Sequence, residues 1–396
     1  MSVNSLHPAN SSPAAAPGFL TKRALRKGGG PAGYVENALK AVAEPFKGIT
    51  ADGTVAPGLF PIQKTAVPTQ SIREAAEEFL ASLNLEQRAK ILFPVDTVEW
   101  RKWSNIHRTL IRHGMPLFEM TDAQCDRAFA LLKETLSTQG FETARDVMRL
   151  NQTVMEMTGR QDEYGEDLYW LSIMGRPSAI EPWGWQIDGH HLNINTFVLG
   201  DQIVMAPTFL GSEPVYAKSG KYAGTRVFKA EEEWGLAVIR ALSSDQRNKA
   251  VLSLDLPREP FTTAFRDNFE LRYEGIRYDA LSSPQRDLLL RLVEVHVGRI
   301  RPGHAEIKIG EVKGHLRETY FAWMGGVEED SVFYYRLHSP VIIIEFDHQR
   351  GQAFPQYEKP YKDHIHVVVR TPNGNDYGKD LLRQHYELSH HHASRT

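Results

Sequence analysis

The sequence has a single cysteine, Cys125, among its 396 residues. An intramolecular disulfide is therefore excluded, and so are zinc sites that need several thiolate ligands. Cys125 lies in a stretch with helical spacing, where a structural thiol is far more common than a nucleophile. Any chemistry must use other side chains.

An excess of basic residues is also missing. Lys and Arg number 46 and Asp and Glu 49, so the formal net charge is −3. Such a chain has little with which to displace counterions from a phosphate backbone, so we expect no nucleic-acid partner. No apolar run approaches the ~20 residues of a membrane-spanning helix, and the first residues lack the pattern of a secretory signal. We therefore expect a cytoplasmic location and no membrane partner.

Three parts are predicted along the chain. Residues 1–68 form a flexible N-terminal arm, because residues 11–33 are rich in Ser, Ala, Pro and Gly, although residues 34–46 have the pattern of a short helix. Residues 69–387 form a single domain. Residues 388–396, which include His390, His391 and His392, form a disordered His-rich tail.

Helical spacing dominates the first half of the domain. Apolar residues recur three and four positions apart over residues 71–91, 122–137 and 141–158, and Gly140 stands where a helix would end. Strand-like runs follow over residues 167–175, 190–199, 202–209, 331–347 and 363–370, with helical spacing between and after them over 231–242, 283–297 and 379–386. This order predicts an α+β fold in which a helical N-terminal half packs on an antiparallel sheet with interspersed helices.

Histidines occur in pairs near the predicted strands. His190 and His191 open one strand, and His364 and His366 are two residues apart on another, so their imidazoles project to one face. Paired imidazoles on a strand are a recurring way to supply ligands to Zn²⁺, Fe²⁺ or Cu²⁺. We therefore predict one divalent metal ion, with Glu213, on the turn after the first hairpin, as a further ligand. For each residue alone, a structural role is the competing interpretation.

The hairpin over residues 331–347 supplies charged groups. If Ser339 and Pro340 form a two-residue turn, one strand face carries Tyr334, Arg336, His338, Val341, Ile343 and Glu345, with Asp347 beyond. Glu345 or Asp347 is then a candidate metal ligand, general base or partner of an imidazole. Arg336 is a candidate anchor for a substrate carboxylate, with a cross-strand salt bridge to Glu345 as the alternative.

Aromatic side chains surround these runs. Trp183 and Trp185 occupy a loop-like stretch, where large rings often form the wall of a pocket, although core packing is the more common role. With Tyr334 and Asn193, which lies on the polar face of its strand, they are the predicted substrate-binding residues. Such a pocket suits a small organic substrate.

Several segments also resemble a known family. The similarity is carried by Glu181–Leu192, Phe209–Pro214, Ser219–Gly224, Glu99–Asn105, His364–His366 and Asp376–Gly378. These runs are similar to the signature of domain-of-unknown-function family 3500, over roughly residues 70–387. The resemblance implies that the polar segments share one domain, and it implies no reaction and no catalytic residue.

The leading functional hypothesis is a metal-dependent hydrolase that acts on a small organic molecule. The ion would lower the pKa of a bound water, a carboxylate would accept the proton, and Arg336 or the indoles would orient the substrate. The catalytic candidates are thus Glu345, Asp347 and Arg336. A mononuclear non-haem iron or copper oxygenase and a non-catalytic ligand-binding or interaction module are the alternatives. Self-association into a homo-oligomer stays open.

Overall fold

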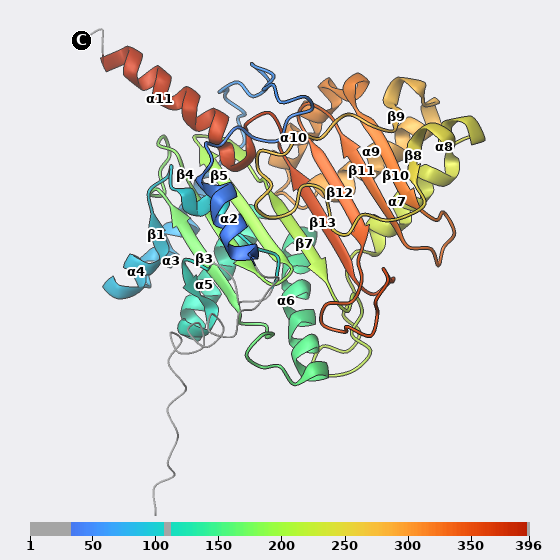
Figure 1. Cartoon of the computed structure of the whole chain (residues 1–396). Coiled ribbons are helices and arrows are strands. Elements are labelled where there is room, and N and C mark those ends of the chain that lie inside the picture. The colour runs from blue at the N-terminus through green and yellow to red at the C-terminus, as the bar shows by residue number, and fades with distance from the viewer. Residues whose placement is uncertain (1–32, 107–111, 394–396) are drawn as a thin grey trace, which may run out of the picture.

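The computed structural model describes residues 33–106 and 112–393 (Figure 1). A 13-stranded sheet runs through it in the order β1-β3-β4-β5-β7-β13-β12-β11-β10-β8, and β2, β6 and β9 pair with β3, β5 and β10. Helices and sheet together confirm the α+β class. The sheet is mixed, however, and not wholly antiparallel as predicted, because β1 pairs with β3 and β8 with β10 in parallel.

The strands are β1 (Leu92–Phe93), β2 (Met115–Pro116), β3 (Tyr169–Met174), β4 (Trp183–Gly189), β5 (Leu192–Leu199), β6 (Gln202–Val204), β7 (Thr208–Ser212), β8 (Val251–Ser253), β9 (Ile276–Arg277), β10 (Tyr320–Gly325), β11 (Phe333–His338), β12 (Ile343–His348) and β13 (Ile365–Arg370). The α-helices are α2 (Tyr34–Ala43), α3 (Gln70–Ala81), α4 (Leu85–Ile91), α5 (Asp122–Thr135), α6 (Thr138–Thr158), α7 (Lys229–Ala241), α8 (Ser244–Ala250), α9 (Ser283–Val297), α10 (His304–Gly314) and α11 (Lys379–Ala393). Short 3₁₀ helices are η1 (Val98–Arg101), η2 (Leu117–Glu119), η3 (Tyr278–Ala280), η4 (Leu316–Glu318) and η5 (Asp376–Gly378).

Helix ends follow local capping chemistry. The helix predicted over residues 71–91 is divided into α3 and α4, because the Asn84 side chain accepts a hydrogen bond from the Gln87 N–H and starts a second helix. Gly140 does not end a helix as predicted. It lies in the first turn of α6, where an added Cβ would collide with the Arg299 backbone. Its role is therefore close packing.

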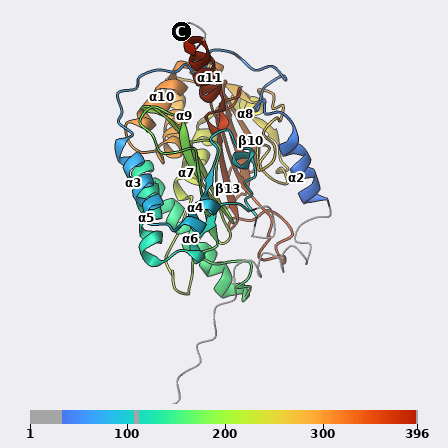
Figure 2. The same cartoon turned by 90° about the vertical axis from the view of Figure 1, so that its left-hand side faces the viewer.

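Most helices cover one face of the sheet, as the edge-on view in Figure 2 shows, with α3 and α5 on one side and α2 on the other. Strand residues such as Ile194, Val367 and Phe346 point toward that layer and share one buried core with helix residues such as Leu131 and Leu292. Each fully buried side chain of this kind stabilises the fold by about 1.5–3 kcal/mol. This face is mostly apolar, and the polar groups buried in it form pairs such as His348 with Glu232 and His296 with Tyr335.

The opposite face of the sheet is polar and is covered by irregular segments and α2. It carries the buried side chains of Gln186, Asp188, Asn193, Asn195, Tyr334, Arg336, Glu345, Asp347, His366 and Arg370. Because unpaired buried polar groups are costly, the covering segments must supply partners to this face.

Part of the predicted arm packs on the domain. The helix expected within residues 34–46 is present as α2. Beyond it, Ile49 is buried with Leu271 and Ile343, and Phe60 belongs to the main core. Residues 47–68 thus contribute to the fold, whereas residues 1–32 lie outside the described part of the chain. At the other end, α11 continues to Ala393, so residues 388–393 extend a helix where a disordered tail was predicted.

Strand β13 joins the two halves of the sheet. It lies antiparallel between β7 and β12, although it is the last strand in the chain. This insertion places β13 one strand away from β5, with β7 between them (Figure 1), and brings His364 and His366 within reach of His191 in the β4–β5 turn. Among the described residues, none of the helices has the length and apolar character needed to cross a bilayer.

Candidate metal centre

Three imidazoles meet at one point on the polar face. The Nε2 atom of His191 lies 3.2 Å from that of His364 and 3.2 Å from that of His366, and the last two are 3.0 Å apart. All three residues are buried. In the described part of the chain, this is the group of His, Cys, Asp or Glu side chains whose ligand atoms are close enough to hold one metal ion.

His191 reaches this point from a tight turn. The sequence pattern placed His190 and His191 at the start of a strand, but Gly189 pairs with Leu192, so the two histidines form the turn between β4 and β5. The φ angle of His191 is 60°, a left-handed conformation that costs a non-glycine residue on the order of 1–3 kcal/mol. Strain of this kind persists where neighbours hold the backbone in place.

Three backbone contacts hold this turn. The Asn105 carbonyl accepts the His191 N–H at 3.0 Å, and the Gly211 N–H donates to the His191 carbonyl at 2.7 Å. The Tyr169 hydroxyl donates to the His190 carbonyl at 3.1 Å. The turn therefore presents the His191 ring in a defined position.

The other two imidazoles come from the start of β13. The Nδ1–H of His364 donates to the Arg350 carbonyl at 2.7 Å, so its Nε2 carries a lone pair. The Nδ1 atom of His366 lies 3.7 Å from the Asp347 Oδ1 atom, and within the described residues neither buried atom has a hydrogen-bond partner. The Arg350 carbonyl therefore sets the tautomer in which Nε2 of His364 is free to ligate.

The donor set fits a divalent ion. Burial lowers the pKa of His191, His364 and His366, so all three are neutral near pH 7. Nitrogens bound at about 2.0–2.1 Å to one ion, at angles between octahedral and tetrahedral, lie about 2.8–3.4 Å apart, and the observed separations fall within this range. Lone pairs that converge in a buried site repel one another, and a cation between them relieves that repulsion.

Gly211 on β7 makes the convergence possible. A Cβ atom at this position would lie 2.8 Å from Cδ2 of His366 and 3.1 Å from Cδ2 of His191. The first distance is too short for a real Cβ atom and the second is tighter than most, and the Ile365 carbonyl oxygen would lie at 2.9 Å. Two rings and a backbone carbonyl thus occupy the space that a side chain would fill. The run 209–214 drew attention in the sequence because of Glu213, and the glycine beside it was missed.

A large cavity opens beside the three imidazoles. It has a volume of about 960 Å³, within the range of small-molecule sites, and both His191 and His366 line it. Its other walls come from α2, the segment before residue 107, the loop 253–266 and the loop 349–352. The imidazoles thus have one side open to a space in which a substrate fits.

Two predicted ligands contact the centre without pointing into it. His190 stacks on His191 with ring centroids 3.9 Å apart, and its Nδ1 atom lies 2.7 Å from Oδ1 of Asn151. Glu213 accepts hydrogen bonds from the backbone of Gln352 and from the Tyr361 hydroxyl, and its Oε2 atom lies 3.6 Å from Nδ1 of His364. Glu213 is therefore placed to anchor the loop beside His364.

The predicted catalytic carboxylates and arginine face the same side of the sheet but do not converge on the imidazoles. Asp347 is the nearest, beside His366, and burial raises its pKa well above the usual range. Glu345 accepts hydrogen bonds from Phe261 N and Thr262 N at 2.6 and 2.8 Å. Neither lines the cavity.

Arg336 does not form the predicted salt bridge. It is opposite Glu345 on the neighbouring strand, yet its guanidinium donates to Glu274 at 2.8 Å. Tyr334 donates to Glu345 at 3.1 Å and takes no part in the cavity wall. The turn between β11 and β12 spans the four residues 339–342, where two were predicted, and Val341 lies in it. The pairing of the two strands is therefore shifted by two positions, which leaves Tyr334, Arg336 and Glu345 on the predicted face.

The predicted substrate-binding tryptophans lie elsewhere. Trp183 and Trp185 are fully buried in the core beneath the helices, on the face of β4 opposite to the polar one. Asn193 is on the polar face, where it donates to the Ile187 carbonyl at 3.3 Å and accepts from Asn195 at 2.7 Å. These three side chains shape the sheet and do not line the cavity.

A family model of proteins of unknown function (DUF3500) matches residues 65–379, which is about four fifths of the chain. The chain belongs to the DUF3500 family. No curated protein and no solved structure matches it. All three converging histidines of this DUF3500 member, and Gly211, lie inside the matched range.

Proposed function

We propose that this DUF3500 protein is a metal-dependent enzyme in which His191, His364 and His366 hold one divalent ion, and that it is most simply a hydrolase. The observation that supports this proposal is the convergence of three buried Nε2 atoms, 3.0–3.2 Å apart, at the wall of a 960 Å³ cavity. A structural metal site is closed by four protein ligands, whereas a catalytic one keeps a position for water or substrate.

Zinc bound by three imidazoles lowers the pKa of its water ligand and so supplies a nucleophile near neutral pH. The residues of the chain do the positioning. The Arg350 carbonyl fixes the tautomer of His364, and Asp347 stands beside Nδ1 of His366 to do the same there. The cavity admits the substrate and keeps it against the imidazoles.

The experiment is a metal analysis of protein whose tail histidines His390, His391 and His392 have all been replaced by Gln, so that adventitious binding is removed. We expect about one equivalent of zinc per chain, and a loss of most of it in His366→Gln. The matched control is His315→Gln, because His315 lies directly before η4 and pairs with Glu318 away from the cavity. The control should keep the full metal content.

Activity is then tested with a panel of activated esters and amides, before and after removal of the metal by a chelator. Zinc with metal-dependent hydrolysis supports the proposal, and iron or copper with oxygen uptake would replace the hydrolase with an oxygenase. A folded protein that binds no divalent metal at micromolar concentration would contradict the proposal and leave a non-catalytic module.

A further inference from the structure

We infer that the cavity beside the three imidazoles binds an organic anion with an apolar body, such as a carboxylic acid, and that Arg258 and Arg350 recognise its charge. This inference rests on the proposed function, because it names the class of substrate for the same site. It is carried by the charge and the chemistry of the cavity wall.

The wall carries more positive than negative charge. Four arginines line it against two carboxylates, Asp255 and Glu259, which is a net charge of +2 in a chain whose overall charge is −3. Asp255 and Tyr34 of α2 both form part of this wall. A basic cavity in an acidic protein selects for anions.

Two of the four arginines already have partners. Arg266 pairs with Glu259 at 2.7 Å, and Arg160 pairs with Glu163 at 3.0 Å and donates to the Ala353 carbonyl. Their guanidinium groups hold the wall together. They have less hydrogen-bonding capacity left for a ligand.

Arg258 and Arg350 differ from that pair. Both side chains are exposed on the cavity wall, and neither forms an ion pair with a described residue. A guanidinium presents two parallel N–H donors that match a carboxylate. Arg350 also ties the anion site to the metal centre, because its own carbonyl accepts the Nδ1–H of His364.

The three proposed metal ligands also favour an anion in the cavity. Three neutral imidazoles leave the full double charge on a bound divalent ion, whereas a carboxylate ligand would reduce it. The carboxylates near the centre, Glu213 and Asp347, face the Nδ1 side of His364 and His366 instead. An anionic group is therefore favoured close to the imidazoles.

The remaining wall is largely apolar and aromatic. Tyr34, Tyr164, Phe261, Leu256 and Met324 all contribute to it. Rings and aliphatic side chains of this kind bind an apolar body, while the arginines bind the charged end. The cavity volume of about 960 Å³ suits a ligand larger than acetate or phosphate.

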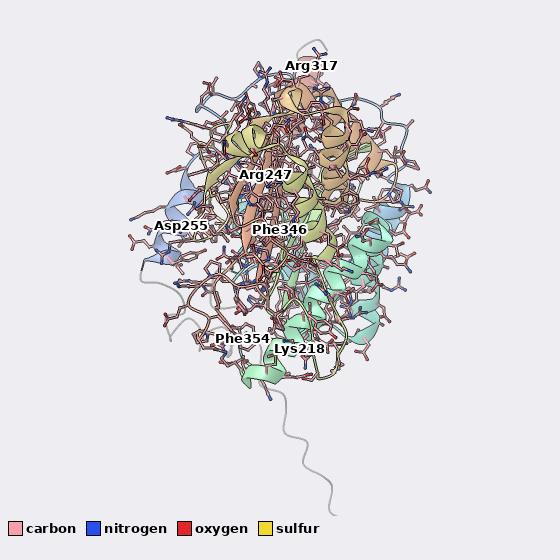
Figure 3. The ribbon with its side chains drawn as sticks, turned by 90° about the vertical axis from the view of Figure 1, so that its right-hand side faces the viewer. Lys218, Arg247, Asp255, Arg317, Phe346 and Phe354 are labelled. Atoms are coloured by element: carbon pink, nitrogen blue, oxygen red, sulfur yellow. The ribbon has the colours of Figure 1, made fainter. Side chains whose placement is uncertain are left out.

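The test compares matched acids and amides. Titration calorimetry on the zinc-loaded full chain uses benzoate, 2-naphthoate and octanoate, each against its neutral amide. We expect every acid that binds to do so at least tenfold more tightly than its amide, with an affinity that falls as salt is added. In Arg258→Gln/Arg350→Gln the preference should drop at least tenfold. Arg317→Gln is the matched control, since Arg317 is exposed at the far end of the molecule (Figure 3).

Zinc content is measured on the same samples, which separates the two proposals. Zinc-loaded protein that shows no preference for acids over amides, or whose preference survives the double substitution, overturns the anion site and leaves the metal centre. Protein that binds no zinc contradicts the proposed function. In that case an acid preference that is lost in the double variant still supports the arginine site, and its absence overturns that site too.

Discussion

Two polar clusters lie on the same face of the sheet, and their polar atoms are satisfied in opposite ways. In the imidazole centre, three Nε2 atoms face one another beside a cavity. In the second cluster, formed by Glu345, Tyr334 and Arg336, the carboxylate accepts from two backbone N–H groups and two hydroxyls. Neither Glu345 nor Arg336 reaches the cavity.

The difference separates a binding site from a structural network. A buried carboxylate with four donors is fully satisfied and holds the loop around residues 261–262 on the sheet. Neutral imidazoles can join only through N–H···N hydrogen bonds, whereas a single ion between the three Nε2 atoms would bind all three lone pairs at once. Burial alone does not identify a functional residue. The imidazole centre differs because its three Nε2 atoms converge beside a cavity, whereas the Nε and Nη1 atoms of Arg336, which have no hydrogen-bond partner among the described residues, do not line it.

The largest expected effect comes from replacing one residue in each cluster, in two separate variants. His191→Gln should lower metal affinity by more than about 100-fold, because one of three ligands is lost. Glu345→Gln should keep the metal but lower the free energy of unfolding by about 2–4 kcal/mol, because its amide N–H₂ faces donors. Metal analysis and urea denaturation measure the two effects. Loss of the metal in a Glu345→Gln protein that stays folded would contradict the assignment of Glu345 to a structural network.

Gly211→Ala should disturb the imidazole centre without removing a ligand. The new Cβ would press on the rings of His366 and His191, and we expect metal affinity to fall about 10- to 100-fold, in line with the loss of an orienting contact. Gly310→Ala is the matched control, because nothing lies within 4 Å of a Cβ there. That control should keep full affinity, and equal behaviour of the two variants would argue against the role assigned to Gly211.

Acidification should lower stability through His338, which lies on β11 two residues after Arg336 of the second cluster. Burial lowers the pKa of His338 to about 3, so the folded state keeps it neutral while the unfolded chain takes up a proton near pH 6.5. Its contribution to stability is therefore complete above pH 6.5 and is lost as the pH falls. Between pH 6.5 and 5 the loss is about 2 kcal/mol, since each pH unit is worth about 1.4 kcal/mol.

Denaturation curves of wild type and His338→Gln across this pH range measure the difference. The variant is less stable at pH 7 but should lose less stability on acidification. Parallel curves for the two proteins would mean that His338 does not remain neutral in the fold.

The smallest expected effect on metal affinity tests whether the carboxylates of Asp347 and Glu274 belong to separate clusters. Asp347→Asn should weaken metal binding about tenfold, because an amide replaces the carboxyl group that faces the His366 Nδ1 atom. Glu274→Gln removes the partner of Arg336 and should leave metal affinity unchanged. Competition with a coloured chelator measures both affinities. Equal losses would mean that both carboxylates act on the metal site, which contradicts the separation of the two clusters.

Local patterns were sufficient for much of the fold. The apolar spacing over residues 283–297 matches α9 at both ends, since a capping box at Ser282 and Gln285 starts this helix. The sequence also predicted which side chains of β11 and β12 share a face. Side chains alternate with a period of two, so a turn that is longer by two residues leaves each of them on the same face. The spacing of His364 and His366 placed both rings on one side of a strand for the same reason.

What only the tertiary structure decided is which distant segments meet. His191 and His364 are 173 residues apart, and they meet because β13 is inserted between β7 and β12. No local periodicity specifies strand order, since that order depends on how all apolar faces are buried together. The same reason explains Trp183 and Trp185, which entered the core, and Gly211, whose missing side chain matters only once two rings occupy its place.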